Sequence, residues 1–354
     1  MTEFFSSKYA SLEPYVPGEQ PKDKKFVKLN TNENPFPPSP LAVKMGKEAE
    51  EHLELYSDPD CLSIRRAAAP VFGVDEDEII FTNGSDEALN FAFMAFCDSS
   101  HPAVFADITY GFYPVFAKVN GIPFEEIPLN NDFSINVEDY IGINKTVFIA
   151  NPNAPTGQII SNEDIARIAE SNPHNVVVID EAYIDFGNES CIPLIRRYNN
   201  LLVTGTFSKS RSMAGARLGF AIGCKGLIAD LNTIRNSTNP YNINSSTMAM
   251  GVGSLMSEDY TKKNCREIVE TREFFTAELR KLGFELADSH TNFVFAHTSS
   301  IPGGELYSAL REKGFLVRHF TKERIDDYLR ITIGSREQMT MLLAAIREIL
   351  EERK

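Results

Sequence analysis

The sequence lacks the features that mark membrane, secreted and disulfide-bonded proteins. No apolar run approaches the ~20 residues that a transmembrane helix needs. The N-terminus has no basic start followed by a long apolar stretch, as a secretory signal would have. The five cysteines form no CxxC pair, and their odd number favours reduced thiols over a disulfide framework. We therefore expect a cytoplasmic protein that makes no use of a membrane.

The motifs of several common functional classes are missing as well. There is no HExxH, and the six histidines show no metal-ligand spacing, so we expect no metal site. There is no Walker loop and no GxSxG nucleophile elbow, and GVGSLM at residues 251–256 lacks the third glycine of a dinucleotide fingerprint. The formal charge of −14 argues against binding to nucleic acid, which needs a basic surface.

The apolar runs that are present predict an α/β fold with two domains, as the length of 354 residues also favours. Short apolar runs alternate with helical stretches, which predicts a large domain whose mainly parallel sheet is covered by helices on both faces. After Pro240, longer helices and further short strands predict a smaller α+β domain. We expect an N-terminal arm at residues 1–40 that packs with the small domain, the large domain at 41–244 and the small domain at 245–354. The strands expected in the large sheet are 79–82, 103–107, 146–150, 175–180, 201–206 and 219–223.

Polar residues follow several of these strands at the point where each strand ends. Ligands of open α/β sheets bind outside the carboxyl ends of the strands, so these side chains are candidates for one site. Ser85 and Asp86 begin a helix, whose free amides attract an anion such as phosphate. Asp180 ends a buried strand, where a carboxylate needs a cation to meet it. Lys209 can become nucleophilic inside a cleft, and Arg217 can clamp a phosphate with two parallel bonds.

Each of these signals also has a purely structural explanation. Ser85 or Asp86 could simply cap a helix. Asp180 could form a buried salt bridge with an arginine, and Lys209 could be an exposed loop residue. The proline-containing turn at residues 151–157 could serve rigidity alone. The functional explanation has the advantage that a single site would use all of these residues.

In their order along the chain, these motifs resemble a known family, the fold type I (aspartate-aminotransferase-type) pyridoxal-phosphate enzymes. Among them the chain is most similar to the histidinol-phosphate aminotransferases. The resemblance runs from PYVPGE and LNTNENPF to the last helix, and DEAY with the later Ser-Lys and arginine is its most specific part. The motifs are GSDE (84–87), Tyr110 in TYGFYP, NPNAPTG (151–157), DEAY (180–183), SKS with Arg217, and Arg330 in LRITIG.

The resemblance implies a site for pyridoxal 5′-phosphate. Lys209 would carry the cofactor as a Schiff base and move the proton between the substrate and the cofactor. Asp180 would keep the pyridine nitrogen protonated, and Tyr183 would donate to the phenolic oxygen of the ring. Tyr110 would stack on the ring. The phosphate would be bound by the Ser85 and Asp86 amides, Ser208 and Arg217.

The resemblance also implies substrate groups and a second subunit. Arg330 matches the arginine that binds the carboxylate or phosphate of the substrate. Arg318 resembles a second anion-binding arginine, although it could equally be a solvated charge at a strand end. Tyr15 resembles an aromatic residue near the imidazole of the substrate. Tyr56, in ELYSDPD, resembles a tyrosine that reaches into the site of the other subunit, so a homodimer is implied.

One position departs from the family pattern. Most relatives carry NPxNPTG, in which the asparagine before the second proline contacts the phenolic oxygen of the ring. Here that position is Ala154. Either Asn153 or Asn151 shifts to make the contact, or Tyr183 makes it alone; we take Asn153 as the candidate.

The activity that the resemblance implies is transfer of the amino group of L-histidinol phosphate to 2-oxoglutarate, which gives imidazole acetol phosphate and L-glutamate in histidine biosynthesis. An aromatic amino acid aminotransferase and a threonine-phosphate decarboxylase could use the same residues. A non-catalytic ligand sensor is disfavoured, because no DNA-binding segment flanks the domain. The Pro- and Lys-rich residues 1–30 could act as a lid, in which case a ligand should slow their hydrogen exchange.

Overall fold

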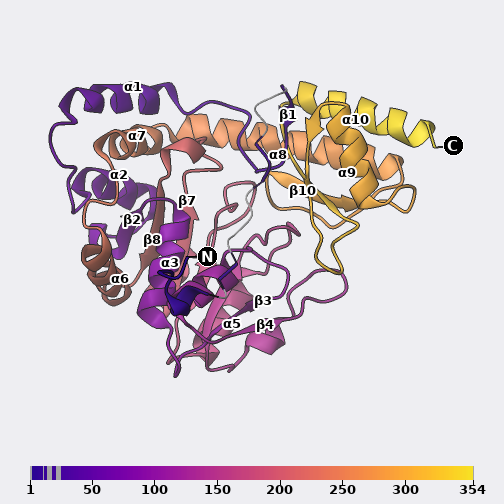
Figure 1. Ribbon diagram of the computed structural model, residues 1–354. Helices are drawn as coiled ribbons and strands as arrows, with labels where there is room; N and C mark the ends of the chain where they lie inside the picture. Colours follow the sequence, from indigo (N-terminus) through magenta and orange to yellow (C-terminus); the bar gives the residue numbers. More distant parts are fainter. Residues whose placement is uncertain (1, 11, 14–17, 21–24, 354) are drawn as a thin grey trace.

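The computed structural model describes residues 2–10, 12–13, 18–20 and 25–353, and most of these form a large and a small lobe (Figure 1). The large lobe contains a seven-stranded sheet, and the small lobe contains a four-stranded sheet. Helix α8 (Glu258–Lys281) runs from the large lobe to the small lobe across the upper part of Figure 1. The predicted fold, a mainly parallel sheet between helices with a smaller α+β unit, is confirmed.

The large sheet has the strand order β2-β8-β7-β6-β5-β3-β4. Its neighbours from β7 to β4 are parallel, whereas β8 is antiparallel to both β2 and β7. The inner strands are apolar and rich in branched residues because helices bury them on both faces. The strands are β2 (Ile79–Thr82), β3 (Ala103–Ala106), β4 (Phe124–Ile127), β5 (Thr146–Ala150), β6 (Val177–Asp180), β7 (Leu201–Thr206) and β8 (Gly219–Gly223).

Strand β4 is the one member of this sheet that the sequence pattern did not predict. Its sequence is FEEI, and Glu125 and Glu126 are exposed. It lies at the edge of the sheet beside β3, where a strand has a single neighbour and tolerates charged side chains. An apolar run is therefore not needed at this position.

Helices cover both faces of the large sheet. One face shares an apolar core with α2, α5 and α7, and the other face shares a core with α3, α4 and α6. Helix α7 contributes Met248 and Leu255 to the first core and packs on α1 and α2, although we placed the start of the small domain before it, at residue 245. The helices are α1 (Pro40–Ala49), α2 (Leu62–Phe72), α3 (Ser85–Phe96), α4 (Tyr113–Asn120), α5 (Asn162–Ser171), α6 (Lys225–Thr238) and α7 (Ser245–Leu255).

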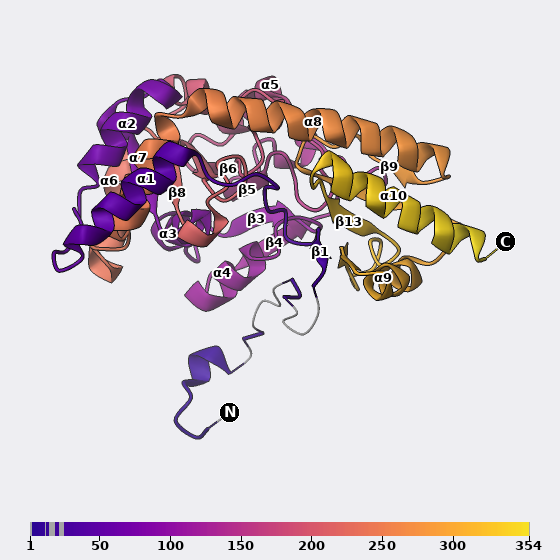
Figure 2. The same cartoon turned by 90° about the horizontal axis from the view of Figure 1, so that it is seen from above.

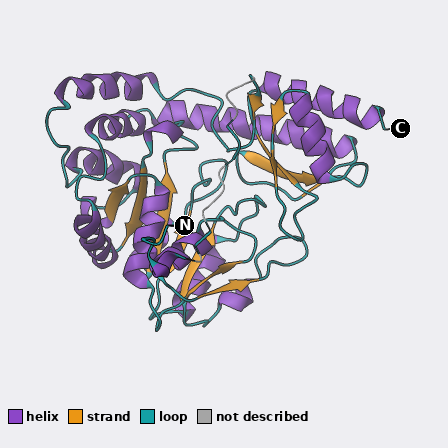
Figure 3. Ribbon diagram, in the orientation of Figure 1, coloured by secondary structure: helices purple, strands orange, loops and turns teal. Residues whose placement is uncertain are grey.

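The small lobe has an antiparallel sheet of order β12-β13-β10-β9, packed against α8 and two further helices (Figure 3). A separate pair of strands joins the N-terminal arm to this lobe, because β1 (Val27–Lys28) runs parallel to β11 (Phe315–Leu316). The other elements are β9 (Glu285–Leu286), β10 (Phe293–His297), α9 (Gly303–Glu312), β12 (Arg318–His319), β13 (Leu329–Thr332) and α10 (Arg336–Glu351).

The first described residues lie apart from both lobes, as the view in Figure 2 shows. Residues 2–8 are exposed, and Phe4 keeps 86% of its surface accessible.

In the described part of the chain, no helix combines the length and the apolar character that crossing a membrane requires. The short 3-10 helices are Ser7–Tyr9, Glu50–His52, Glu76–Glu78, Val137–Tyr140, Ile192–Arg196 and Ala214–Ala216.

Candidate active site

Two adjoining cavities lie at the carboxyl ends of the large-sheet strands, where the arm passes between the lobes. We call them the sheet cavity, which Asp180 lines, and the lobe cavity, which Arg330 lines. The polar residues selected from separate strand ends therefore converge on one region. Both cavities are lined by Thr31, Tyr110, Ala154, Tyr183 and Lys209.

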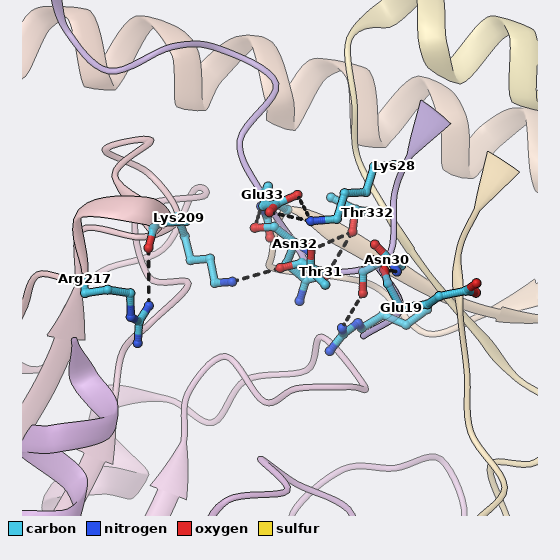
Figure 4. A network of polar contacts seen from close by, with 12 residues as sticks. Glu19, Lys28, Asn30, Thr31, Asn32, Glu33, Lys209, Arg217 and Thr332 are labelled. Atoms are coloured by element: carbon cyan, nitrogen blue, oxygen red, sulfur yellow. Dashed lines mark hydrogen bonds and ion pairs between the residues drawn. The ribbon is translucent and has the colours of Figure 1, made fainter. Parts of the chain in front are cut away.

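Lys209 follows β7, and its side chain extends towards the arm (Figure 4). Its Nζ donates a hydrogen bond to the carbonyl oxygen of Thr31 at 3.1 Å and lies 5.8 Å from the centre of the Tyr183 ring. Lys209 is half-buried, so the explanation as an exposed loop residue does not apply. An amine held by a carbonyl oxygen inside a cavity can act as a nucleophile or as a base.

Asp180 is the last residue of β6, and it is buried with its carboxylate at the sheet cavity. Oδ2 accepts a hydrogen bond from Tyr113 Oη at 3.2 Å, and Oδ1 accepts one from Thr204 Oγ1 at 3.3 Å. Burial raises the pKa of Asp180 to about 6, and the hydrogen bond from Tyr113 opposes that rise. The described residues include no salt bridge to Asp180, so the alternative of a buried pair with an arginine is not realised. A cation in the cavity would fit beside this carboxylate.

An anion-binding corner is formed where α3 begins. Arg217 Nη2 contacts Asp86 Oδ2 at 2.9 Å, and Nη1 contacts Ser208 Oγ at 3.4 Å. Gly84 precedes the helix with φ +83°, and a Cβ atom there would lie 2.5 Å from Arg217 Nη2. Glycine thus permits both the backbone turn and the close approach of the guanidinium. With the helix amides of Ser85 and Asp86, this corner suits a phosphate group.

Two tyrosines line both cavities. Tyr110 Oη donates to Asp86 Oδ1 at 2.6 Å, which ties this ring to the anion-binding corner. Tyr183 is buried, and its hydroxyl oxygen accepts a hydrogen bond from Asn32 Nδ2 at 2.8 Å. The stacking of Tyr110 and the ring contact of Tyr183 stay predictions.

The asparagines of the 151–157 turn point into the protein. Asn151 forms two hydrogen bonds with the backbone of Ile160, at 2.9 and 3.2 Å. Asn153 Nδ2 donates to Ile108 O at 2.9 Å and Thr156 Oγ1 at 3.0 Å. Neither asparagine lines the two cavities, whereas Ala154 lines both. The structure therefore does not bring Asn153 to the position that we predicted for it, because its amide has partners beneath the turn.

The arginines of the small lobe face the lobe cavity from neighbouring strands. Arg318 of β12 and Arg330 of β13 are direct partners in the antiparallel register, and both line this cavity. Arg330 Nη2 donates to Asn30 O at 3.0 Å. Like charges directly opposite each other destabilise a sheet, so this pairing suits the binding of an anion between them. Arg318 is half-buried at the cavity and is not simply a solvated strand end.

A comparison with family models decides what this arrangement is. The model described as "Aminotransferase class I and II" matches residues 24–346, which covers both lobes and all the cavity residues named above. The chain belongs to the class I and II aminotransferases. Lys209, Asp180 and Arg217 lie within the matched region.

Individual aminotransferases match over the full chain. The histidinol-phosphate aminotransferase of Clostridium acetobutylicum is 43% identical and covers 99% of this chain and 100% of its own length. That of Marinomonas sp. is 46% identical, with coverages of 99% and 100%. The structure of the Sinorhizobium meliloti histidinol-phosphate aminotransferase in complex with pyridoxal-5′-phosphate has a TM-score of 0.89 at 22% identity, and covers 100% of this chain and 99% of that one. This last likeness shows a shared fold.

Tyr56, another of the predicted aminotransferase site residues, does not lie at the cavities of this chain. Tyr56 is 84% exposed and stacks on Tyr241 with ring centres 4.7 Å apart. It does not line either cavity, so its predicted role depends on a second subunit. Tyr15 lies outside the described residues.

Sequence reasoning missed several residues of the aminotransferase site. Thr31 and Asn32, both in the arm, line the lobe cavity, and the Tyr113 hydroxyl donates a hydrogen bond to Asp180. The polar run NTNEN at residues 30–34 could have marked the first two, since buried asparagines in an extended arm need partners. Tyr113 had no such signal, because an aromatic residue in a helix usually belongs to the core.

Proposed function

We propose that this chain is a pyridoxal-phosphate-dependent histidinol-phosphate aminotransferase. It transfers the amino group of L-histidinol phosphate to 2-oxoglutarate, giving imidazole acetol phosphate and L-glutamate. The observation that carries the proposal is the convergence of Lys209, Asp180 and Arg217 on one cavity beside two opposed arginines. The full-length identity to relatives of that name supports the choice of substrate.

The residues of the sheet cavity fit pyridoxal 5′-phosphate. When bound, this cofactor supplies an electron-accepting ring that allows an amino group to move between carbon skeletons. Arg217, Ser208 and the first amides of α3 would bind its phosphate. Asp180 would hold a proton on the pyridine nitrogen, which supplies the cation that this buried carboxylate lacks.

Lys209 performs the proton transfer. Its Nζ is the amine positioned between the Thr31 carbonyl and the Tyr183 ring, and it would take the proton from Cα of the amino donor as a general base. The Lys209 ammonium formed in this way would then donate the same proton as a general acid, which completes the transfer. The arm contacts the amine through the Thr31 carbonyl oxygen.

The two arginines bind the substrates. The phosphate of histidinol phosphate and the carboxylates of 2-oxoglutarate and glutamate are anions, so Arg318 and Arg330 can serve both halves of the reaction. Their cavity adjoins Lys209. An anionic tail bound there would direct the amino group of the substrate towards Nζ.

We infer a homodimer in the cytoplasm as the working form. Support for the dimer comes from apolar side chains left exposed near one another along the chain, Leu53, Leu55 and Tyr56. Large exposed apolar groups are typical of subunit interfaces. Support for the compartment comes from the five cysteines, all of which are free. Unpaired thiols are usual in a reducing environment.

Initial rates on three amino donors test this proposal. The purified protein is assayed with histidinol phosphate, phenylalanine and threonine phosphate, each with 2-oxoglutarate, and the products are identified. We expect the highest kcat/KM with histidinol phosphate and the formation of one glutamate per donor. A faster reaction of phenylalanine, or release of carbon dioxide from threonine phosphate, would replace the proposal with the corresponding activity.

A further inference from the structure

A chain of buried hydrogen bonds connects the arm and the small lobe to the Tyr183 hydroxyl. Asn32, in the arm, is 1% exposed, and its Nδ2 donates to Tyr183 Oη at 2.8 Å. Thr332, the last residue of β13, accepts from Asn32 N at 3.0 Å and donates to Asn32 Oδ1 at 3.1 Å. Figure 4 shows Asn32 and Thr332 next to each other. Tyr183 lines the two cavities.

The direction of each hydrogen bond in this network follows from the backbone N–H of Asn32, which can only donate. The backbone N–H of Asn32 must donate to Thr332 Oγ1, so the single proton of the threonine is free to go to Asn32 Oδ1. That bond places the amide oxygen on the threonine side and the NH₂ group on the tyrosine side. An NH₂ group cannot accept, so Tyr183 Oη is the acceptor there. The proton of the phenol is then left to point elsewhere, and the cavity is the open direction.

The backbone of Asn32 also indicates a special position. Its φ is +57°, in the left-handed region that asparagine tolerates better than other residues with a side chain. Backbone strain of this kind persists where the surrounding structure holds it, and such positions cluster at functional sites. Asn292 Nδ2 donates to Asn32 O at 3.0 Å, which fixes the same residue from a third side.

In this protein, the contact to the phenolic oxygen of the ring relies more on the Tyr183 hydroxyl than it does in relatives with NPxNPTG. The residue at the asparagine position is Ala154, which has no donor. The amides of Asn151 and Asn153 are committed to Ile160, Ile108 and Thr156. Of the three side chains considered for the contact with the phenolic oxygen, Asn151, Asn153 and Tyr183, only Tyr183 lines the sheet cavity.

We propose that Asn32, held by Thr332, is a positioning residue that fixes the Tyr183 hydroxyl proton towards the cofactor and so compensates for Ala154. The inference rests on the proposed function, in that it requires bound pyridoxal phosphate, but it does not require a particular amino donor. Asn32 contacts the reacting atoms only through Tyr183.

The test is the pH midpoint of the change in visible absorbance of the bound cofactor, measured without substrate. A hydrogen bond donated to the phenolic oxygen withdraws negative charge from that oxygen. Loss of this hydrogen bond favours the protonated form of the nitrogen that joins Lys209 to the cofactor, so the pH midpoint rises. We expect Asn32→Gly to raise the midpoint by about one pH unit, the size of one hydrogen bond to a charged oxygen. Glycine is chosen because it adopts φ +57° without strain.

Matched variants separate positioning from a general effect on folding. Tyr183→Phe should raise the midpoint as Asn32→Gly does, and adding Asn32→Gly to Tyr183→Phe should give no further shift. Thr332→Val, which removes the hydroxyl, should also raise the midpoint, whereas Thr332→Ser should leave it in place. An unchanged midpoint in Asn32→Gly, or an equal shift in the Tyr183→Phe background, would overturn the inference.

The same measurements distinguish this inference from the proposed function. If wild-type protein shows the absorbance change but does not transaminate histidinol phosphate, the proposed substrate is wrong while the midpoints still decide the role of Asn32. If wild-type protein binds no cofactor, both proposals are wrong.

Discussion

At the scale of single residues, two neighbouring carboxylates have different surroundings and different tasks. Asp180 faces the sheet cavity, and its partners are the Tyr113 and Thr204 hydroxyls. Glu181 turns away from the cavity and accepts hydrogen bonds from Ser190 Oγ and Cys191 N. The first is available to a ligand, while the second holds the segment that follows β6 in place.

Glu181 makes the stability of the fold depend on pH. Burial raises the pKa of Glu181 from its ordinary 4.5 to about 7. A carboxyl whose pKa is raised by folding contributes most below pH 4.5, and this contribution is lost as the pH rises through 7. We expect Glu181→Gln to lack this loss and to gain on the order of 3 kcal/mol over wild type between pH 4.5 and 8.

Urea unfolding at both pH values measures the effect of Glu181→Gln. The exposed Glu189→Gln is the control, and it should follow the wild-type pH dependence. Wild type and variants are compared in the same cofactor state, because Asp180 also titrates with a raised pKa. A Glu181→Gln protein with the same pH dependence as wild type would show that Glu181 is not the group responsible.

At the scale of elements, strands β12 and β13 bring two like charges together at the lobe cavity. Losing one hydrogen-bonded charge partner of an anion costs about 1.5–3 kcal/mol, so we expect Arg330→Gln to lower kcat/KM about ten- to a hundredfold for both histidinol phosphate and 2-oxoglutarate. Arg318→Gln should lower it in the same direction. The absorbance of the bound cofactor should not change, because neither arginine lines the sheet cavity.

Steady-state kinetics with each substrate varied in turn checks this prediction. Arg347→Gln, on α10 and paired with Glu278, is the control for removing a surface arginine. An Arg330→Gln enzyme with unchanged kcat/KM for both substrates would place the anion elsewhere.

Individual strands and strand ends also show which parts of the fold and of the site the sequence predicts. The strands of the large sheet that are buried on both faces were predicted, because burial demands apolar runs. Strand β4, with Glu125 and Glu126, was not, because an edge strand carries no such run. The residues at the strand ends, such as Asp180 and Lys209, were predicted, since topology places them at one edge. Asn32 was not predicted, because its partners Tyr183 and Thr332 are 151 and 300 positions away.

At the scale of the whole molecule, the two lobes and the arm build the site together. The large lobe supplies Asp180 and Lys209, the small lobe supplies Arg330, and the arm supplies Thr31. Tyr56 is exposed on the large lobe, and in the proposed homodimer it would reach the site of the second copy of the chain.

Mixing two variants, one inactive and one strongly impaired, tests whether the site uses a second copy of the chain. We expect Lys209→Ala to be inactive and Tyr56→Ala to be strongly impaired when each is assayed alone. In a mixed dimer, one site has the wild-type Lys209 of one subunit and the wild-type Tyr56 of the other. An equal mixture that exchanges subunits should recover about a quarter of wild-type activity, because half of the dimers are mixed and each has one intact site. A mixture no more active than its components would show that each site uses its own Tyr56 or none.

The central claim is that Lys209 would carry the cofactor as a Schiff base in the cavity that Asp180 also lines. The most direct measurement is reduction of the purified protein with borohydride, followed by protease digestion and mass spectrometry of the peptides. The account predicts a reduced pyridoxyl group on the peptide that contains Lys209, and none in Lys209→Ala protein. A label on a different lysine, or no label on a protein that transaminates, would contradict it.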